Sequence, residues 1–271
     1  MSGVTIELDG RKVQVQPGLS ILQAAANCGV EIPHLCTCDG LRTEGNCRSC
    51  LVEVQGERNL VASCSRSVKP GMVVQINSPR AVKNRALVLE LMLSDLPQGG
   101  DYGELSTAAA QAGVTVRPAL QAQRAPAPHA HDASHPAMQV NLDACIQCTR
   151  CVRACRESQV NGVIGLAGRG ADTHIVFDLS DPMGLSSCVA CGECVQACPT
   201  GAISAKPLAS ATHETAEAFG TKPGQCVRFN AQDKTVDSVC PYCGVGCLLT
   251  YHVQDNKIIS VDGRDGPANH G

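Results

Sequence analysis

The sequence carries two copies of one closely spaced cysteine pattern, over residues 145–155 and 188–198. Each copy reads Cys-x2-Cys-x2-Cys-x3-Cys, and a proline follows the second. Thiolates at this spacing can bind three irons of one [4Fe–4S] cluster, whereas the last cysteine of each copy lies on a helix that leads away and serves the other cluster. The predicted ligand sets, with these fourth ligands exchanged, are Cys145, Cys148, Cys151 and Cys198, and Cys188, Cys191, Cys194 and Cys155.

A more widely spaced set of four cysteines precedes these copies and follows the pattern Cys-x10-Cys-x2-Cys-x13-Cys. A long gap followed by Cys-x2-Cys suits a loop around a [2Fe–2S] cluster, and Gly45 and Asn46 let backbone N–H groups approach the sulfides. A zinc site, which also uses four thiolates, is the alternative, although zinc ribbons favour two Cys-x2-Cys pairs. The predicted [2Fe–2S] ligands are Cys36, Cys47, Cys50 and Cys64.

A further site near the end of the sequence has three closely spaced cysteines. We interpret them as an incomplete set for a third [4Fe–4S] cluster, with Cys226 as an alternative fourth ligand. Its members are Cys240, Cys243 and Cys247. Of the 18 cysteines, two others remain. We interpret Cys28 as a small buried residue and Cys38 as a bystander beside a ligand.

The composition excludes several classes of protein. The chain of 271 residues is long enough for two or three small domains. Its formal net charge of −3 gives no electrostatic reason to expect nucleic acid or an anionic membrane as a partner. The opening stretch, "MSGVTIELDGRKVQV", shows no secretory leader, and no apolar run approaches transmembrane length. A leaderless sequence rich in Cys-x2-Cys pairs predicts metal ligation in a reducing cytoplasm, without membrane insertion.

Residues 1–78 predict a compact α+β unit. Alternating apolar residues on both sides of Asp9-Gly10 indicate a hairpin. The stretch "LSILQAAANCG" indicates a short helix that Ser20 caps and Gly29 ends. Further strands are predicted at residues 51–54 and 72–76. A hairpin, a helix and a cysteine loop in this order are typical of a β-grasp ferredoxin.

The composition changes sharply after residue 95. The stretch "RPALQAQRAPAPHAHDASHPAM" is rich in Ala, Pro, Gln and His and indicates a linker. We interpret His129, His131 and His135 as solvated, because no cysteine or carboxylate cluster accompanies them. The predicted boundaries are an amphipathic helix over 79–95, a linker over 96–138, a dicluster unit over 139–206, a second linker over 207–225 and an incomplete cluster domain over 226–271.

No catalytic motif accompanies the cysteines. The sequence has no nucleophile elbow, no phosphate loop and no His-Glu-x-x-His pair, and the glycines of "LAGRGAD" indicate a turn. We therefore predict no catalytic residue in this chain and expect it to carry electrons.

Several stretches resemble the large iron–sulfur subunit of respiratory complex I, whose N-terminal module also begins the α subunit of soluble NAD-dependent formate dehydrogenases. The matching stretches are "IPHLC", "GNCRSCLVEV", "VASC" and "CIQCTRCVRACRE". The last part, "SVCPYCGVGCLLTYHV" followed by "SVDGRDGPANHG", resembles specifically the formate dehydrogenase α subunit, where its molybdopterin-binding domain begins. The resemblance implies an α+β fold: a β-grasp [2Fe–2S] domain, a bacterial-type 2[4Fe–4S] ferredoxin domain and a fragment of a molybdopterin-oxidoreductase [4Fe–4S] domain.

The resemblance also implies a function. Formate would be oxidised at a molybdenum or tungsten bis-pterin centre in the remainder of the α subunit, and the clusters would relay the electrons to a partner flavin/NAD-binding iron–sulfur subunit. The small electron-transfer subunit of an NAD-coupled hydrogenase, or a complex I-like module, is the first alternative. A zinc-stabilised interaction protein is the second.

The sequence departs from the family in two places. The family's fourth cysteine of the last site, and its residues for formate oxidation, would lie beyond Gly271, so we expect a fragment of a longer subunit that does not oxidise formate alone. The family's His-x3-Cys-x2-Cys-x5-Cys site is the second departure. Leu96 stands where its histidine would be, and residues 65–144 contain no cysteine. We therefore expect that cluster to be absent.

Overall fold

The computed structural model describes residues 3–121, 129–206, 234–241, 244–254 and 257–266. The chain divides into two units, Met1–Ala205 and Lys206–Gly271, which are described separately. The second predicted linker, residues 207–225, lies outside the described residues. Among the described helices, none combines the length and the apolar character needed to cross a membrane.

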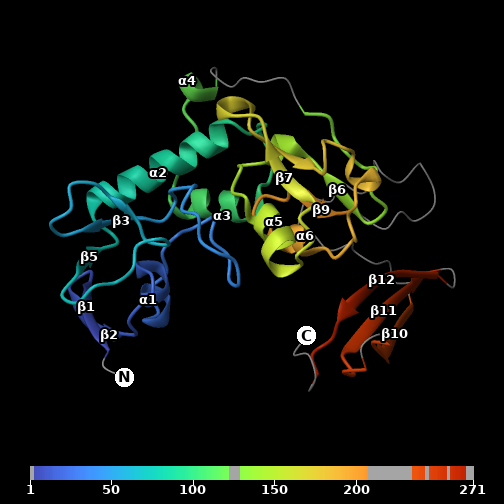
Figure 1. The fold of residues 1–271 in the computed structure, drawn as a ribbon, viewed down its shortest axis with the longest axis horizontal. Helices are drawn as coiled ribbons and strands as arrows, with labels where there is room; N and C mark the ends of the chain where they lie inside the picture. Colours follow the sequence, from blue (N-terminus) through green and yellow to red (C-terminus); the bar gives the residue numbers. More distant parts are fainter. Residues whose placement is uncertain (1–2, 122–128, 207–233, 242–243, 255–256, 267–271) are drawn as a thin grey trace. The chain divides into compact units, whose positions relative to one another are not determined.

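The first unit begins with a five-stranded sheet in the order β2-β1-β5-β3-β4 (Figure 1). Strand β1 pairs antiparallel with β2 and parallel with β5. Asp9 and Gly10 both have positive φ, as a two-residue hairpin turn requires. The strands are β1 (Val4–Leu8), β2 (Arg11–Val15), β3 (Leu51–Val54), β4 (Val61–Ala62) and β5 (Val73–Gln75).

Helix α1 (Ile21–Asn27) packs one apolar face on this sheet. Ser20 and Gln23 form a capping box, in which each side chain bonds the other's backbone N–H. The buried face of the helix, Ile21 and Ala24 among it, joins Ile6 of the sheet in one core. Between α1 and β3 the chain forms no helix or strand, and this long loop holds three of the predicted ligands.

Helix α2 (Pro79–Ser94) lies where the sequence predicts it, but its buried side is not purely apolar. Arg85 is buried and donates hydrogen bonds to the carbonyl oxygens of Leu51 at 2.9 Å and Ile76 at 2.6 Å. These bonds hold α2 against β3 and the end of β5. Leu91 on the same helix is 52% exposed, so the helix is less cleanly amphipathic than expected.

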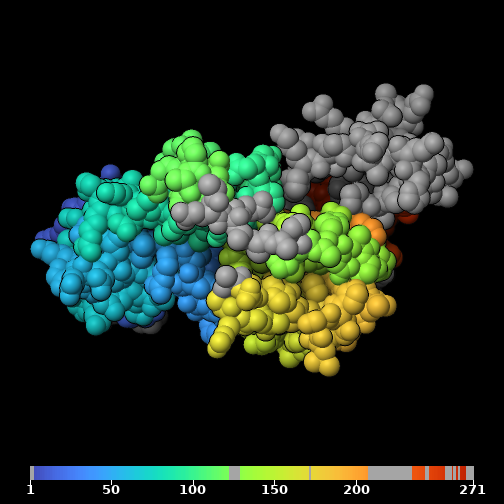
Figure 2. Space-filling view, turned by 90° about the horizontal axis from the view of Figure 1, so that it is seen from above, coloured from blue at the N-terminus to red at the C-terminus, as the bar shows by residue number. Residues whose placement is uncertain are grey.

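The stretch 96–138, expected to be a linker, contains helices α3 (Gly103–Gln111) and α4 (Pro118–Gln121). Leu96, Tyr102 and Leu105 are buried there. They reach apolar partners that are distant in sequence, which is why local composition concealed this structure. In Figure 2 the described atoms of this unit form one continuous body, in which the blue atoms lie next to yellow atoms of the dicluster part.

The dicluster part is built from very short elements. It contains two two-stranded antiparallel sheets, β6-β9 and β7-β8, and helices α5 and α6, which lie next to each other (Figure 1). The strands are β6 (Met138–Val140), β7 (Ile164–Ala167), β8 (His174–Phe177) and β9 (Ile203–Ala205). The helical elements are η1 (Leu142–Ala144), α5 (Arg150–Arg153), the π-helix η2 (Ala154–Ser158), η3 (Gly170–Asp172), η4 (Met183–Leu185) and α6 (Glu193–Ala197).

The second unit contains a three-stranded antiparallel sheet in the order β10-β11-β12. Its strands are β10 (Lys234–Val239), β11 (Leu248–Gln254) and β12 (Lys257–Gly263). The turn between β10 and β11 is closed by a hydrogen bond from the N–H of Cys240 to the carbonyl oxygen of Cys247, at 2.8 Å.

Candidate iron–sulfur centres

The structure brings the four N-terminal cysteines together in a buried group. Cys36, Cys47 and Cys50 come from the loop between α1 and β3, and Cys64 follows β4. The N–H of Cys36 donates to Cys47 Sγ at 3.3 Å. All four side chains are buried, with Cys36 and Cys50 fully so.

Hydrogen bonds among these thiols separate their pKa values. Bonds from Cys47 and Cys64 hold the pKa of Cys36 far below its usual range. A bond from Cys64 lowers the pKa of Cys50 to about 6 in spite of burial. The same bonds raise the pKa values of Cys47 and Cys64, because each of these thiols donates to an ionised neighbour. The group thus favours two thiolates and two thiols at neutral pH, and metal binding would remove the remaining protons.

Gly45 allows the loop to close on this group. It has φ +68°, and a Cβ at this position would lie 3.3 Å from Ser65 Oγ and 3.8 Å from Cys64 Sγ. A side chain would therefore be strained at Gly45 and would press on the Ser65 hydroxyl, next to the predicted ligand Cys64.

The pKa values give a pH prediction for the iron-free N-terminal sheet. Below the pKa of an unfolded cysteine, about 8.5, the unfolded chain binds protons that folded Cys36 and Cys50 have lost. The free energy of unfolding should therefore fall as pH drops from about 8.5 towards 6. Above about 8.5 it should fall again, because folded Cys47 and Cys64 keep protons that the unfolded chain releases.

Urea unfolding of the iron-free chain, followed by circular dichroism at several pH values, measures this dependence. Cys50→Ala should reduce the slope on the acid side of the curve, because only Cys36 then contributes to it, whereas Cys28→Ala, which removes a thiol outside the group, should keep the slope. A free energy that does not change between pH 6 and 8.5 would contradict the prediction.

The first [4Fe–4S] set surrounds a small cavity in the dicluster part. Its walls include all four predicted cysteines and the apolar side chains of Ile175 and Ile203. Cys198, which follows α6, lies here with the cysteines of the other copy of the motif. Burial raises the pKa of Cys148 to about 12 and that of Cys151 well above its usual value. The four cysteines are Cys145, Cys148, Cys151 and Cys198.

The second [4Fe–4S] set lines a separate small cavity, together with Met138 and Ile164. Cys155 reaches it from η2, as Cys198 reaches the first cavity from the end of α6. Their assignment as exchanged fourth ligands stays a prediction. Burial, and then the nearby thiols, raise the pKa of Cys194 to about 12, whereas Cys191 is exposed. The four cysteines are Cys155, Cys188, Cys191 and Cys194.

The residues of these sites fit iron–sulfur clusters by their chemistry. Each cavity combines four thiols with apolar walls. Within the described parts of the chain, no group of three or more His, Cys, Asp or Glu side chains could hold a single metal ion. A zinc site needs its ligands on one ion, whereas each thiolate of a cubane binds its own iron.

The last predicted site lies in the second unit and is described only in part. Cys240 and Cys247 are half-buried at the two ends of the β10–β11 turn. Cys243 and Cys226 lie outside the described residues. Their assignment stays a prediction.

The [2Fe–2S] loop lies directly against the first [4Fe–4S] motif. Glu44 Oε2 accepts a hydrogen bond from Thr149 Oγ1 at 2.8 Å, and Asn46 Nδ2 donates to the carbonyl oxygen of Gln147 at 3.3 Å. An apolar cluster that includes buried Leu35, Leu89, Leu96 and Leu105 supports this contact. Leu96, at the position of the family's histidine ligand, is therefore a packing residue here.

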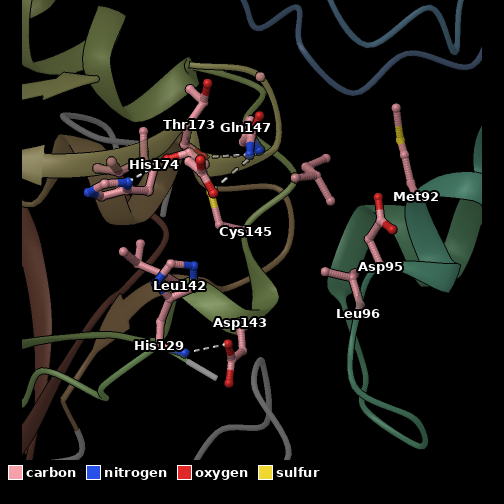
Figure 3. Close-up of a pocket in the computed structure, with 14 residues that line it drawn as sticks. Met92, Asp95, Leu96, His129, Leu142, Asp143, Cys145, Gln147, Thr173 and His174 are labelled. Atoms are coloured by element: carbon pink, nitrogen blue, oxygen red, sulfur yellow. Dashed lines mark hydrogen bonds between the residues drawn. The ribbon is translucent and has the colours of Figure 1, made fainter. Parts of the chain in front are cut away.

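A larger cavity of about 530 Å³ lies beside Cys145 (Figure 3). Figure 3 shows Asp95 and Leu96 on one side of it, with Cys145 and His174 on the other. Cys145 is half-buried, so solvent can approach this side of the first [4Fe–4S] set.

The predicted linker histidines differ from one another. His129 is exposed, and its backbone N–H donates a hydrogen bond to Asp143 Oδ1 at 2.9 Å. His131 is also exposed, as expected. His135 is buried, and its Nδ1 accepts a hydrogen bond from the N–H of Ala137 at 3.1 Å. The interpretation of His135 as solvated was therefore wrong, because this stretch folds against the dicluster part.

Sequence reasoning missed two buried arginines between the cysteines of the first motif. Arg150 pairs with Glu104 at 2.7 Å and contacts the Cys38 side chain, so Cys38 has a polar partner. Arg153 is 2% exposed, and its Nη2 donates a hydrogen bond to the carbonyl oxygen of Cys36 in the [2Fe–2S] loop. The only signal in the sequence is an i, i+3 pair of arginines in "TRCVRAC", which does not indicate partners more than one hundred residues away.

Comparison with known proteins identifies three iron–sulfur domains in the chain. Residues 2–79 match the 2Fe-2S iron-sulfur cluster binding domain, residues 144–202 the 4Fe-4S dicluster domain, and residues 233–271 the molybdopterin oxidoreductase Fe4S4 domain. These matches confirm the predicted fold class. They also favour iron–sulfur clusters over the zinc alternative.

Relatives and a solved structure extend the comparison. The mitochondrial NADH-ubiquinone oxidoreductase 78 kDa subunit of Candida albicans is 35% identical over 228 residues, 77% of this chain and 29% of that protein. An NADH-quinone oxidoreductase subunit of Rhizobium meliloti is 30% identical over 269 residues, 95% of this chain and 29% of that protein. A chain in the crystal structure of an NAD+-reducing [NiFe]-hydrogenase in the H2-reduced state gives a TM-score of 0.69 at 28% identity, covering 77% of this chain and 90% of that chain.

The chain thus spans less than a third of the length of these two curated relatives. It is an iron–sulfur protein homologous to these subunits of NADH-type oxidoreductases and to a chain of an NAD+-reducing hydrogenase. The predicted relationship to respiratory complex I is confirmed.

Proposed function

We propose that the chain is the iron–sulfur electron relay of the α subunit of a cytoplasmic NAD-dependent formate dehydrogenase. One observation carries the proposal: a segment matching the molybdopterin oxidoreductase Fe4S4 domain follows a [2Fe–2S] domain and a dicluster domain in the same chain. A pterin-linked reaction would therefore be joined to a chain of clusters. Formate as its substrate rests on the stretch "SVCPYCGVGCLLTYHV".

The side chains and backbone of this chain can tune such a relay. Bound iron–sulfur clusters supply one-electron transfer, with potentials set by hydrogen bonds to sulfur, charge and solvent exposure. Backbone N–H groups of Gln147, Ala190 and Ile203 donate to the sulfurs of Cys145, Cys188 and Cys198 at 3.4 to 3.5 Å. Cys148, Cys151, Cys155 and Cys194 are buried, which limits the exposure of these sulfurs to solvent.

The proposal includes partners of the chain. The remainder of the α subunit would hold the molybdenum or tungsten bis-pterin centre where formate is oxidised. A flavin/NAD-binding iron–sulfur subunit would accept the electrons from this chain. That the two curated relatives are named as subunits supports an assembly of this kind.

A second candidate is the electron-transfer subunit of an NAD-coupled hydrogenase or a complex I-like module. The likeness to the hydrogenase chain, 90% of which is covered, favours this candidate.

An activity assay on the native assembly distinguishes the candidates. An affinity tag on this chain, expressed in the cells that make it, would allow purification with its partners under anaerobic conditions. Our proposal expects formate-dependent reduction of NAD+ by the purified assembly. Reduction of NAD+ with H2 but not with formate, or NADH oxidation with quinone alone, would contradict it and support the second candidate. Iron and acid-labile sulfide should be present in every case.

A further inference from the structure

Arg153 connects the [2Fe–2S] site to the first [4Fe–4S] site through hydrogen bonds. It lies at the end of α5, between the two groups of cysteines, and is 2% exposed. Its Nη2 donates to the carbonyl oxygen of Cys36 and, at 3.2 Å, to that of Cys148. Its Nη1 donates to the carbonyl oxygen of Arg42. One guanidinium nitrogen therefore binds the backbone of one predicted ligand from each site.

In the described part of the chain, Arg153 forms no ion pair with a carboxylate, and Glu157, four residues later, pairs with Arg42 instead. All three of its acceptors there are neutral carbonyl oxygens, and its Nε is buried without a partner. Arg150, one turn earlier on the same helix, differs because Glu104 pairs with it at 2.7 Å. A buried cation is costly unless an anion compensates it.

The thiolates of the two sites can supply that compensation. A cluster bound by four thiolates is an anion, and it gains one further negative charge when it takes up an electron. A buried cation beside it therefore stabilises the reduced form more than the oxidised form. The low dielectric constant of the protein interior strengthens this attraction.

We propose that Arg153 is a shared electrostatic partner of the [2Fe–2S] cluster and the Cys145–Cys148–Cys151–Cys198 cluster, and that it raises the reduction potential of both. It is a positioning residue that acts through charge and through the backbone of Cys36 and Cys148. This inference rests on the proposed cluster assignment, which the spectra of the unchanged protein test separately.

The test is an EPR-monitored redox titration of the full chain, purified anaerobically with its clusters. Arg153→Gln removes the charge and keeps a hydrogen-bonding side chain. At a fixed solution potential, we expect the ratio of reduced to oxidised protein to fall about tenfold at two centres. This fall corresponds to a reduction potential lower by about 59 mV for a one-electron couple. These centres are the [2Fe–2S] cluster and one of the two [4Fe–4S] clusters, while the other [4Fe–4S] cluster stays unchanged.

Two further variants separate charge from other effects. Arg156→Gln is the matched control: it changes net charge equally, but Arg156 is exposed and its charge is screened by solvent, so neither of the two potentials should move. Arg153→Lys keeps the charge and should leave both potentials close to those of the unchanged protein.

The outcomes decide between roles. Potentials that stay constant in Arg153→Gln, or a shift of only one centre, would overturn the proposal. If Arg153→Gln does not bind iron, the Arg153→Lys variant provides the test. In Arg153→Lys, two bound clusters with unchanged reduction potentials would support the role of the charge. Loss of iron or lowered potentials in Arg153→Lys would leave Arg153 with a packing role only. Absence of [2Fe–2S] and [4Fe–4S] signals in the unchanged protein would instead refute the cluster assignment.

Discussion

Cys198→Ala is expected to remove the [4Fe–4S] cluster of the other cysteine motif, that of Cys145, Cys148 and Cys151. Cys198 lies in their cavity, and the N–H of Ile203 donates to its sulfur at 3.5 Å. Three thiolates leave one iron corner without a protein ligand. The iron content should therefore fall by one whole cluster.

A double variant shows which cysteines share a cluster. If Cys145 and Cys198 bind the same cluster, then Cys145→Ala, Cys198→Ala and the double variant should each lose the same amount of iron. Cys145→Ala combined with Cys155→Ala should lose twice as much, because Cys155 lies in the other cavity. Iron and acid-labile sulfide per chain, measured after anaerobic purification, decide between these patterns. Additive losses for Cys145 with Cys198 would show that each motif binds its own cluster.

Removal of iron with a chelator is expected to unfold the dicluster part while the N-terminal sheet persists. The dicluster part has only two-stranded sheets, with strands of three or four residues, and such sheets are marginal alone. Several cysteines belong to its hydrophobic core. Cluster binding therefore supplies much of its folding free energy. Cys145→Ala should destabilise the same part.

The N-terminal sheet provides the internal comparison. It has five strands, a capped helix and a core that includes Ile6, Ile21, Val52 and Val74. Hydrogen–deuterium exchange with and without iron should show loss of protection over β6 to β9 and retention over β1, β2, β3 and β5. Equal protection of the dicluster part in both states would contradict the prediction.

The features that the sequence predicts well depend on local chemistry. Asp9-Gly10 specifies a hairpin turn by itself, and Ser20 with Gln23 specifies a helix start. Cysteine spacing likewise reflects the geometry of one cluster. These signals need no knowledge of the remainder of the chain.

The features that it misses depend on contacts between distant segments. Leu105 becomes a core residue only because Leu35 and Leu96 lie beside it, so α3 fell within a predicted linker. Arg153 is unremarkable in sequence, because its acceptor at Cys36 is 117 residues away. His135 was misjudged for the same reason. Spacing along the chain could not indicate such partners.

The contact between the [2Fe–2S] loop and the first cysteine motif also constrains how this protein can diverge. The N–H of Arg42 donates to Glu157 Oε2 at 2.8 Å, and Glu44 accepts from Thr149. The loop thus serves both its own cysteines and the neighbouring domain. A gene fusion that exchanged residues 1–78 for those of a distant homologue would bring in a loop that had evolved in contact with a different surface. Over evolution, the two domains should therefore be inherited as a pair, with changes on one side followed by changes on the other.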